Sequence, residues 1–137
     1  MAPNQTNLFS LISRVLIALL FIPAGISKIM GFAGTVAYIN SAHMPLPEVA
    51  AVIAIVIELG FGILLLLGYQ TRWAALAIGL FCVVVPFIFH PYWAVPAAQL
   101  MAQKNNFFKD LAIAGGLFAI AAWGPGGWSL DAKRRAA

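Results

Sequence analysis

The sequence contains very few charged residues. Only 9% of its 137 residues are Asp, Glu, Lys or Arg, whereas 63% are hydrophobic. Because a soluble domain carries about 25% charged residues, this composition excludes a protein whose whole surface faces water. The mean hydropathy of +0.95 places the chain in a membrane. With so few charges, a net charge of +4 does not predict nucleic-acid binding.

Cysteine and histidine are nearly absent too. Cys82 is the single cysteine, which excludes an internal disulfide, a CxxC redox pair and a multi-thiolate metal site. Its apolar neighbours indicate a packing role. The two histidines, His43 and His90, lie outside the apolar runs or at their edge, and we expect His43 to be solvated. A catalytic zinc takes about three protein ligands, so neither a metal site nor a haem is expected.

What the sequence does contain is a series of long apolar runs. At about 20 residues per crossing, the length allows four transmembrane helices and no soluble domain of useful size. The sequence therefore predicts one all-α membrane domain over residues 1–137, folded as a four-transmembrane-helix antiparallel bundle. The expected spans are residues 8–27, 48–67, 73–89 and 107–123.

The segments outside these spans are short and more polar. No basic residue precedes the first apolar run and no Ala-x-Ala site follows it, so we expect a retained helix and not a signal peptide. Residues 32–42, bracketed by glycine and proline, predict a short interfacial helix between the first two spans. Residues 92–106, which contain two prolines and Trp93, predict a loop along the interface.

The basic residues are unevenly distributed between the two ends of the expected bundle. Four spans place both termini on one side. That side collects Arg14, Arg72, Lys133, Arg134 and Arg135, and the other side carries Lys28, Lys104 and Lys109. The positive-inside rule then predicts that both termini face the cytoplasm.

Small and polar residues recur along each span at helical spacing, so that those of one span share one face. Close packing in lipid depends on such small residues. We therefore expect the four stripes to face one another and to form a polar interior. The stripes are Arg14, Ala18, Phe21, Gly25 and Lys28; Ala51, Ala54, Glu58 and Gly62; Arg72, Gly79, Cys82, Pro86 and His90; and Lys109, Ala112, Gly116 and Trp123.

Glu58 is the strongest candidate for a functional residue. It lies near the middle of its span, where a carboxylate costs about 3 kcal/mol on insertion scales. Counted from the cytoplasmic end, Arg14 lies at a similar depth. Two interpretations are open: a buried Arg14–Glu58 pair that fixes helix register, or a carboxylate that gains and loses a proton while a ligand is handled.

A second group of polar residues closes the outer ends of three spans. Lys28 and Lys109, taken singly, are typical of side chains that reach toward the headgroups. Together with His90 they would line one outward-facing mouth. His90 is either an ordinary helix-end residue or a hydrogen-bond donor to a quinone carbonyl or a proton relay.

Several motifs occur together in a fixed order: Arg14, then Phe21-Ile-Pro-Ala-Gly-Ile-Ser-Lys28, Ile57-Glu58-Leu-Gly, Leu67-Gly-Tyr-Gln-Thr-Arg72, Phe107-Phe-Lys-Asp-Leu-Ala and Gly124-Pro-Gly. Over nearly the whole chain this set resembles the DoxX family of small bacterial membrane proteins. The resemblance implies a four-helix protein of the bacterial inner membrane with a redox association. It points to Arg14, Lys28, Glu58, Arg72, His90 and Lys109 as site residues, with Asp110 standing where many relatives have Asn.

We expect from these observations a redox-associated protein that binds a quinone or a similar lipophilic ligand. Glu58 and His90 are the catalytic candidates, and Arg14, Lys28, Arg72 and Lys109 are the ligand-binding candidates. Because the sequence contains no electron carrier of its own, a soluble or membrane-bound redox partner is expected; homo-oligomerisation is left open. The alternative is a non-catalytic membrane anchor or scaffold for a soluble redox or detoxification enzyme.

Overall fold

The computed structural model describes residues 2–136, and within them it contains helices and turns but no strand. Three adjoining elements, α3, η1 and α4, form one continuous helix over residues 47–67, and η1 is a π-helical segment in its middle. In chain order the elements are α1 (Pro3–Met30), α2 (Phe32–Ser41), α3 (Pro47–Ile55), η1 (Val56–Phe61), α4 (Gly62–Leu67), α5 (Thr71–Phe89), the 3-10 turn η2 (Tyr92–Ala94), α6 (Ala97–Trp123) and α7 (Leu130–Ala136).

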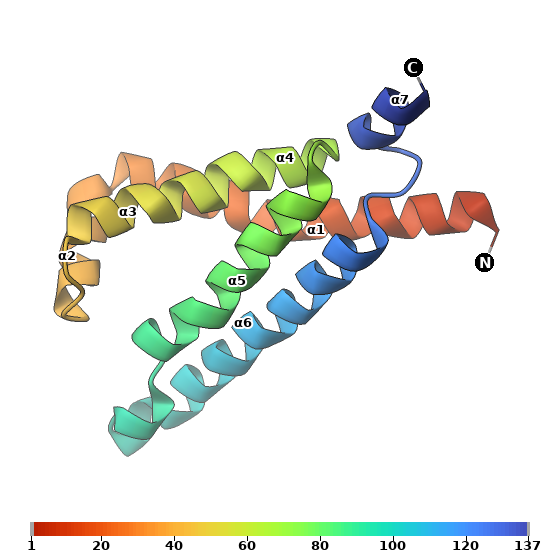
Figure 1. Ribbon diagram of the computed structural model, residues 1–137. Coiled ribbons are helices and arrows are strands. Elements are labelled where there is room, and N and C mark those ends of the chain that lie inside the picture. Colours follow the sequence, from red (N-terminus) through yellow and green to blue (C-terminus); the bar gives the residue numbers. More distant parts are fainter. Residues whose placement is uncertain (1, 137) are drawn as a thin grey trace.

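The helices are arranged as two antiparallel hairpins that cross each other (Figure 1). The first hairpin pairs α1 with the α3–η1–α4 helix, and the second pairs α5 with α6. The two hairpins meet where α5 packs against η1 and α4. The all-helical prediction is therefore confirmed, whereas a four-helix bundle with all four helices side by side is not.

Among the residues that the structure describes, three helical segments are long and apolar enough to cross a membrane: residues 3–30, 47–67 and 71–94. Two of the expected spans, 48–67 and 73–89, agree with the helices within two residues. Helix α1 is longer than the expected span of residues 8–27, extending past it at both ends. Helix α6 is not among the three segments, and its first half carries Lys104, Lys109 and Asp110.

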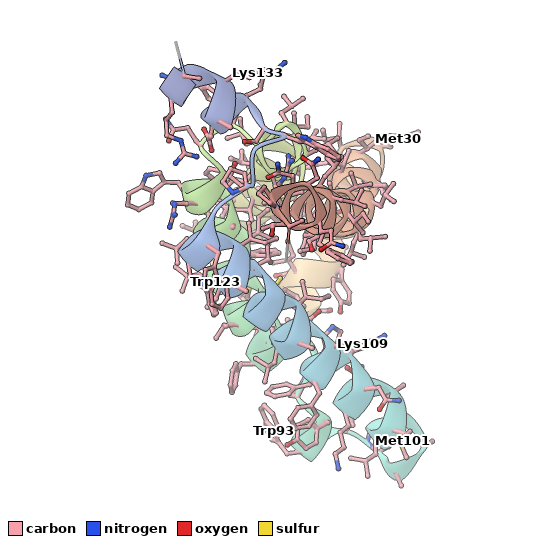
Figure 2. The ribbon with its side chains drawn as sticks, turned by 90° about the vertical axis from the view of Figure 1, so that its right-hand side faces the viewer. Met30, Trp93, Met101, Lys109, Trp123 and Lys133 are labelled. Atoms are coloured by element: carbon pink, nitrogen blue, oxygen red, sulfur yellow. The ribbon has the colours of Figure 1, made fainter. Side chains whose placement is uncertain are left out.

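The prediction of a loop over residues 92–106 is wrong for most of its length, because α6 begins at Ala97. Ala, Gln, Leu and Met, which favour helix strongly, fill its first turns after Pro96. An aromatic cluster fixes this end of the hairpin: Phe107 of α6 packs edge-on against Phe87 of α5 and Trp93 of η2. Figure 2 shows Trp93 beside the lower part of α6, where the helix begins and where Met101 is labelled.

Three of the four expected stripes are buried as predicted, and the fourth is wrong. In α1, in the α3–η1–α4 helix and in α5, most of the small residues that were expected to face inward are buried. In α6, Lys109, Ala112, Gly116 and Trp123 are exposed. Large apolar side chains occupy the buried face of α6 instead, because α6 packs along α5 and not against α1; they are Phe107, Leu117 and Ile120, together with Ala114.

Two glycines set the register of the first hairpin. A Cβ atom at Gly25 would lie 2.7 Å from Cβ of Leu59 and 2.8 Å from its backbone nitrogen. A Cβ atom at Gly62 would lie 3.2 Å from Cγ1 of Ile22. The two backbones therefore approach as closely as small residues allow, which is the way helices associate in lipid.

Arg14, in the N-terminal half of α1, joins three segments of the chain. Its side chain is 1% exposed. One terminal nitrogen, Nη1, donates to the carbonyl of Leu66 at 2.8 Å, and the other, Nη2, donates to the carbonyl of Trp128 at 2.6 Å. Because the last carbonyls of a helix have no partner within it, the guanidinium caps α4 while it fastens the C-terminal segment to α1.

The C-terminal helix is docked on the start of α5 by Asp131. Its carboxylate accepts hydrogen bonds from the backbone nitrogens of Gln70 and Thr71, at 2.8 and 2.9 Å, and from Oγ1 of Thr71 at 2.7 Å. Burial would raise the pKa of Asp131, but these hydrogen bonds and the charge of Arg135 outweigh it, so its pKa lies below the ordinary value. Asp131 is thus ionised at neutral pH, when it caps α5.

We predict that Gly25→Ala destabilises the protein by about 1–3 kcal/mol, because the added methyl group meets the backbone of Leu59 and not a flexible side chain. Gly116→Ala is the matched control, since no heavy atom lies within 4 Å of a Cβ at that position. Thermal unfolding in detergent measures both. Equal stability of the two variants would show that the Gly25 contact does not set the packing.

Candidate functional site

Glu58, in the middle of the α3–η1–α4 helix, forms an ion pair with Lys28 in the last turn of α1. Nζ of Lys28 lies 2.7 Å from Oε2 of Glu58. The Glu58 side chain is 8% exposed and the Lys28 side chain 30%, so the pair is buried on the glutamate side and open on the lysine side. A carboxylate in an apolar environment needs such a partner.

The Arg14–Glu58 pair, one of the two interpretations of Glu58, is not formed: Glu58 pairs with Lys28 instead. The tight contact between Gly25 and Leu59 places Glu58 beside the last turn of α1, which carries Lys28. The guanidinium of Arg14 lies at the end of α4, where it binds backbone carbonyls. The sequence analysis compared the depths of Arg14 and Glu58 from the ends of their expected spans. That comparison gave the wrong register between the two helices because α1 extends past the end of α4 (Figure 1).

Glu58 lies within η1, the π-helical segment. Here hydrogen bonds run from residue i to i+5, which widens the turn and redirects the side chains. Glu58 and Gly62, four residues apart, are both buried, and η1 contacts α1 and α5. Single π-helical turns inside longer helices are frequent at functional sites, and this one presents a carboxylate toward two neighbouring helices.

A cavity of about 330 Å³ opens beside the ion pair, between α2, α3 and α5. Lys28 and Glu58 line one part of it and His90 another, with Thr35 and Tyr38 contributed by α2. The remaining wall is apolar: Ile39, Met44, Ala50, Ile53, Ala54, Phe81, Val84, Val85, Ile88 and Phe89. The site is thus an apolar chamber with a charged pair and an imidazole at its edge.

A second, smaller hollow of about 190 Å³ lies on the other side of Glu58, toward α1 and α6. It shares Glu58, Phe81, Val85 and His90 with the first cavity and adds Asp110 among its lining residues. Glu58 and His90 therefore face two hollows at once. The structure brings together these two residues, which the sequence analysis selected as the catalytic candidates, and Lys28.

His90 is held by two residues of α6. Its Nδ1 atom is 2.8 Å from Oε1 of Gln103, which accepts the hydrogen bond, and its Nε2 atom is 3.8 Å from Oδ2 of Asp110. The imidazole is therefore oriented, and its Nε2 atom is directed toward a carboxylate. When it is protonated, His90 forms an ion pair with Asp110; when it is neutral, Nε2 is a hydrogen-bond acceptor.

The other selected residues lie outside both hollows. Arg14 caps α4, as described above. Arg72 donates from Nη1 to the carbonyls of Ala121 and Ala122, at 2.9 and 2.6 Å, and so caps the end of α6. Lys109 is exposed on α6 (Figure 2) and lines neither hollow. The structure thus places the two arginines at helix ends, where they bind backbone oxygens.

Sequence reasoning missed two residues around the site. Gln103 was assigned to a loop, although it lies seven residues before Asp110 and so on the same face of a helix. Tyr38 of α2 stacks on Phe89 of α5, with ring centroids 5.3 Å apart, and lines the cavity. The first could have been found from the helical spacing, but the second depends on how α2 folds back.

We predict that Lys28 and Glu58 are energetically coupled. Lys28→Met and Glu58→Gln each remove one partner, and each is expected to cost about 2 kcal/mol, below the value for a fully buried pair because Lys28 is partly exposed. The double variant is expected to cost less than the sum. Lys109→Met is the control cation, which should combine additively with Glu58→Gln. Unfolding in detergent measures the cycle, and additive losses for Lys28 and Glu58 would contradict the pairing.

Comparison with known proteins places the chain in a family. Residues 9–91, which include Lys28, Glu58 and His90, match the DoxX family. The chain is 39% identical over 123 residues to the inner membrane protein YphA of Escherichia coli K12, a match that covers 90% of this chain and 88% of the relative. It is 38% identical over 121 residues to the inner membrane protein YqjF of the same organism, covering 88% of each.

A more distant similarity covers a smaller part of the chain. It is 31% identical over 75 residues to the Surfeit locus protein 4 homolog of Drosophila melanogaster, or 53% of this chain and 28% of that protein. No solved structure matches the chain. Because the family match covers more than half of the chain and both Escherichia coli relatives align over nearly their whole length, the chain belongs to the DoxX family of membrane proteins.

Proposed function

We propose that the cavity beside the Lys28–Glu58 pair binds a quinone or a similar lipophilic ligand. The observation that carries the proposal is a buried ion pair that opens onto an apolar chamber of about 330 Å³. Small-molecule sites have volumes of about 300–1,000 Å³, mostly apolar walls and a few polar groups that orient the ligand. The Escherichia coli relatives are named inner membrane proteins, and a ligand dissolved in such a membrane reaches the cavity from the bilayer.

The polar groups of the cavity suit the chemistry of a quinone. Nζ of Lys28 is a hydrogen-bond donor to a carbonyl oxygen, and Glu58 lies in contact with it. Reduction of a quinone to a quinol takes up two electrons and two protons, so a group that exchanges a proton must lie within hydrogen-bond reach. Glu58 and His90 are such groups. We propose that the electrons come from a partner oxidoreductase.

We predict that Glu58→Gln lowers the amount of quinone that co-purifies with the protein at least tenfold, because the amide cannot form the ion pair that holds Lys28 in place. Glu48→Gln is the matched control: it makes the same change on the same helix, at an exposed position outside the cavity. Solvent extraction of the purified variants followed by chromatography measures quinone per protein. Unchanged quinone content in Glu58→Gln, or none in the wild type, would contradict the proposal.

The scaffold alternative gives the opposite result in a second measurement. If the protein only anchors a soluble redox enzyme, partnered redox activity of membranes carrying Glu58→Gln at matched protein level stays at the wild-type value. Loss of activity then maps to substitutions in residues 32–42 or 92–106. In the quinone proposal Glu58→Gln abolishes the activity while the protein still folds.

We further propose that α6 is a fourth span and that both termini face the cytoplasm. Contacts at one end of the molecule support this arrangement. Oδ1 of Asn7, near the start of α1, accepts a hydrogen bond from the backbone nitrogen of Gly127 at 2.6 Å, and Arg14 binds the carbonyl of Trp128. These contacts bring residues 127 and 128 back to α1, which supports an even number of crossings.

Cysteine labelling tests this topology. In a Cys82→Ser background, a cysteine added after Ala137 is expected to react with a membrane-impermeant maleimide only after the cells are lysed. A cysteine at position 43, in the segment between α2 and α3, is expected to react in intact cells. Labelling of the C-terminal cysteine in intact cells would contradict the assignment.

A further inference from the structure

A hollow of about 360 Å³ lies at the end of the molecule opposite the cavity, where α5 begins. The start of α5, Pro125 and α7 surround it. We name it the arginine hollow, because Arg72, Arg134 and Arg135 line it together with one carboxylate, that of Asp131. Three positive charges and one negative charge leave a net charge of +2 around this hollow.

Each arginine of the hollow makes a contact with another part of the protein or with its own helix. Arg72 donates from Nη1 to two carbonyls at the end of α6. Arg135 donates from Nε to the carbonyl of Asp131 at 3.3 Å, and the guanidinium of Arg134 lies 5.1 Å from the centre of the Tyr69 ring. These contacts reduce the cost of ordering the side chains when a ligand binds.

The three arginines have guanidinium N–H groups that are available to donate hydrogen bonds to a ligand. None of their nitrogens lies within 4.0 Å of a carboxylate oxygen among residues 2–136. The carboxylate oxygens of Asp131 accept hydrogen bonds from Gln70 and Thr71. Asp131 therefore caps α5 and does not pair with the guanidinium groups. A guanidinium presents its N–H groups as a planar fork that matches two oxygens of a phosphate. An anion with phosphate-like geometry would match these N–H groups.

The surroundings of the hollow favour a lipid headgroup over a soluble anion as the source of such a phosphate. Trp73 forms part of its wall and is 69% exposed, and Trp123 at the end of α6 is 82% exposed. Tryptophan at helix ends marks the level of the lipid headgroups. The exposed side chains that follow along α5, such as Leu80, form an apolar surface below the hollow. A soluble anion needs no such surface, whereas the acyl chains of a lipid do.

We propose that the arginine hollow binds the phosphate of an anionic phospholipid headgroup. The positive-inside rule accounts for basic residues on this side of the membrane, but not for three guanidinium groups fixed around one hollow. The proposal is independent of the quinone site, because the two cavities share no residue.

Lipid titration of the purified protein tests the proposal. We expect phosphatidylglycerol to raise the melting temperature in detergent and phosphatidylcholine with the same acyl chains to have little effect. Arg134→Gln and Arg135→Gln are each expected to weaken the apparent affinity for phosphatidylglycerol about fivefold, the effect of one basic residue near an anionic surface. Lys133→Gln is the matched control, because Lys133 lies on the same helix but does not line the hollow (Figure 2).

Three results would overturn the proposal. Equal weakening by Lys133→Gln would mean that only diffuse charge attracts the lipid. Equal stabilisation by phosphatidylcholine would mean that the negative headgroup is not recognised. Inorganic phosphate at millimolar concentration, added without lipid, is the third arm, and stabilisation as large as that by phosphatidylglycerol would identify a soluble anion as the ligand.

Discussion

The geometry of the rest of the site depends on the ion pair between Lys28 and Glu58. A carboxylate in an apolar helix is unfavourable unless a cation reaches it, and Lys28 reaches Glu58 only in one register of the first hairpin. The near-contact of the Gly25 and Leu59 backbones fixes that register. The π-helical segment then directs Glu58 toward α1 and α5, and the cavity opens beside it.

At the opposite end of the molecule, the charged side chains form hydrogen bonds with backbone groups that lack partners at the helix ends. Arg14 caps α4 and Arg72 caps α6, while Asp131 caps the start of α5. Unpaired backbone groups are costly away from water, so charged side chains at this end satisfy them and also join the C-terminal segment to the rest of the chain. The charges of the two ends thus have separate structural roles: Lys28 and Glu58 pair with each other, whereas the arginines and Asp131 bind backbone groups at helix ends.

The apolar runs and the small-residue spacing predicted four spans and four buried stripes. Among residues 2–136, three helical segments are apolar enough to span a membrane and three stripes have buried small residues, because these features depend on helical periodicity alone. Periodicity does not fix the register between helices, so the sequence left open an Arg14–Glu58 pair that the structure does not contain. In α6 the face that contains Gly116 was predicted to be buried, and this prediction was wrong. Two faces of that helix have small residues, and the face that contains Leu117 is the one that packs on α5. The family resemblance rested on ordered motifs and is confirmed, but the path of α2 that brings Tyr38 to the cavity has no signature in the sequence.

Infrared difference spectroscopy tests the central claim most directly, because it observes the carboxylate of Glu58 itself. The chain has two glutamates, Glu48 and Glu58, so ¹³C-glutamate labelling in a Glu48→Gln background reports on Glu58 alone. If Glu58 meets the ligand, adding a short-chain quinone to the reconstituted protein shifts the labelled carboxylate band, and reduction of the quinone shifts it again. A labelled band that stays the same at saturating quinone would contradict the account.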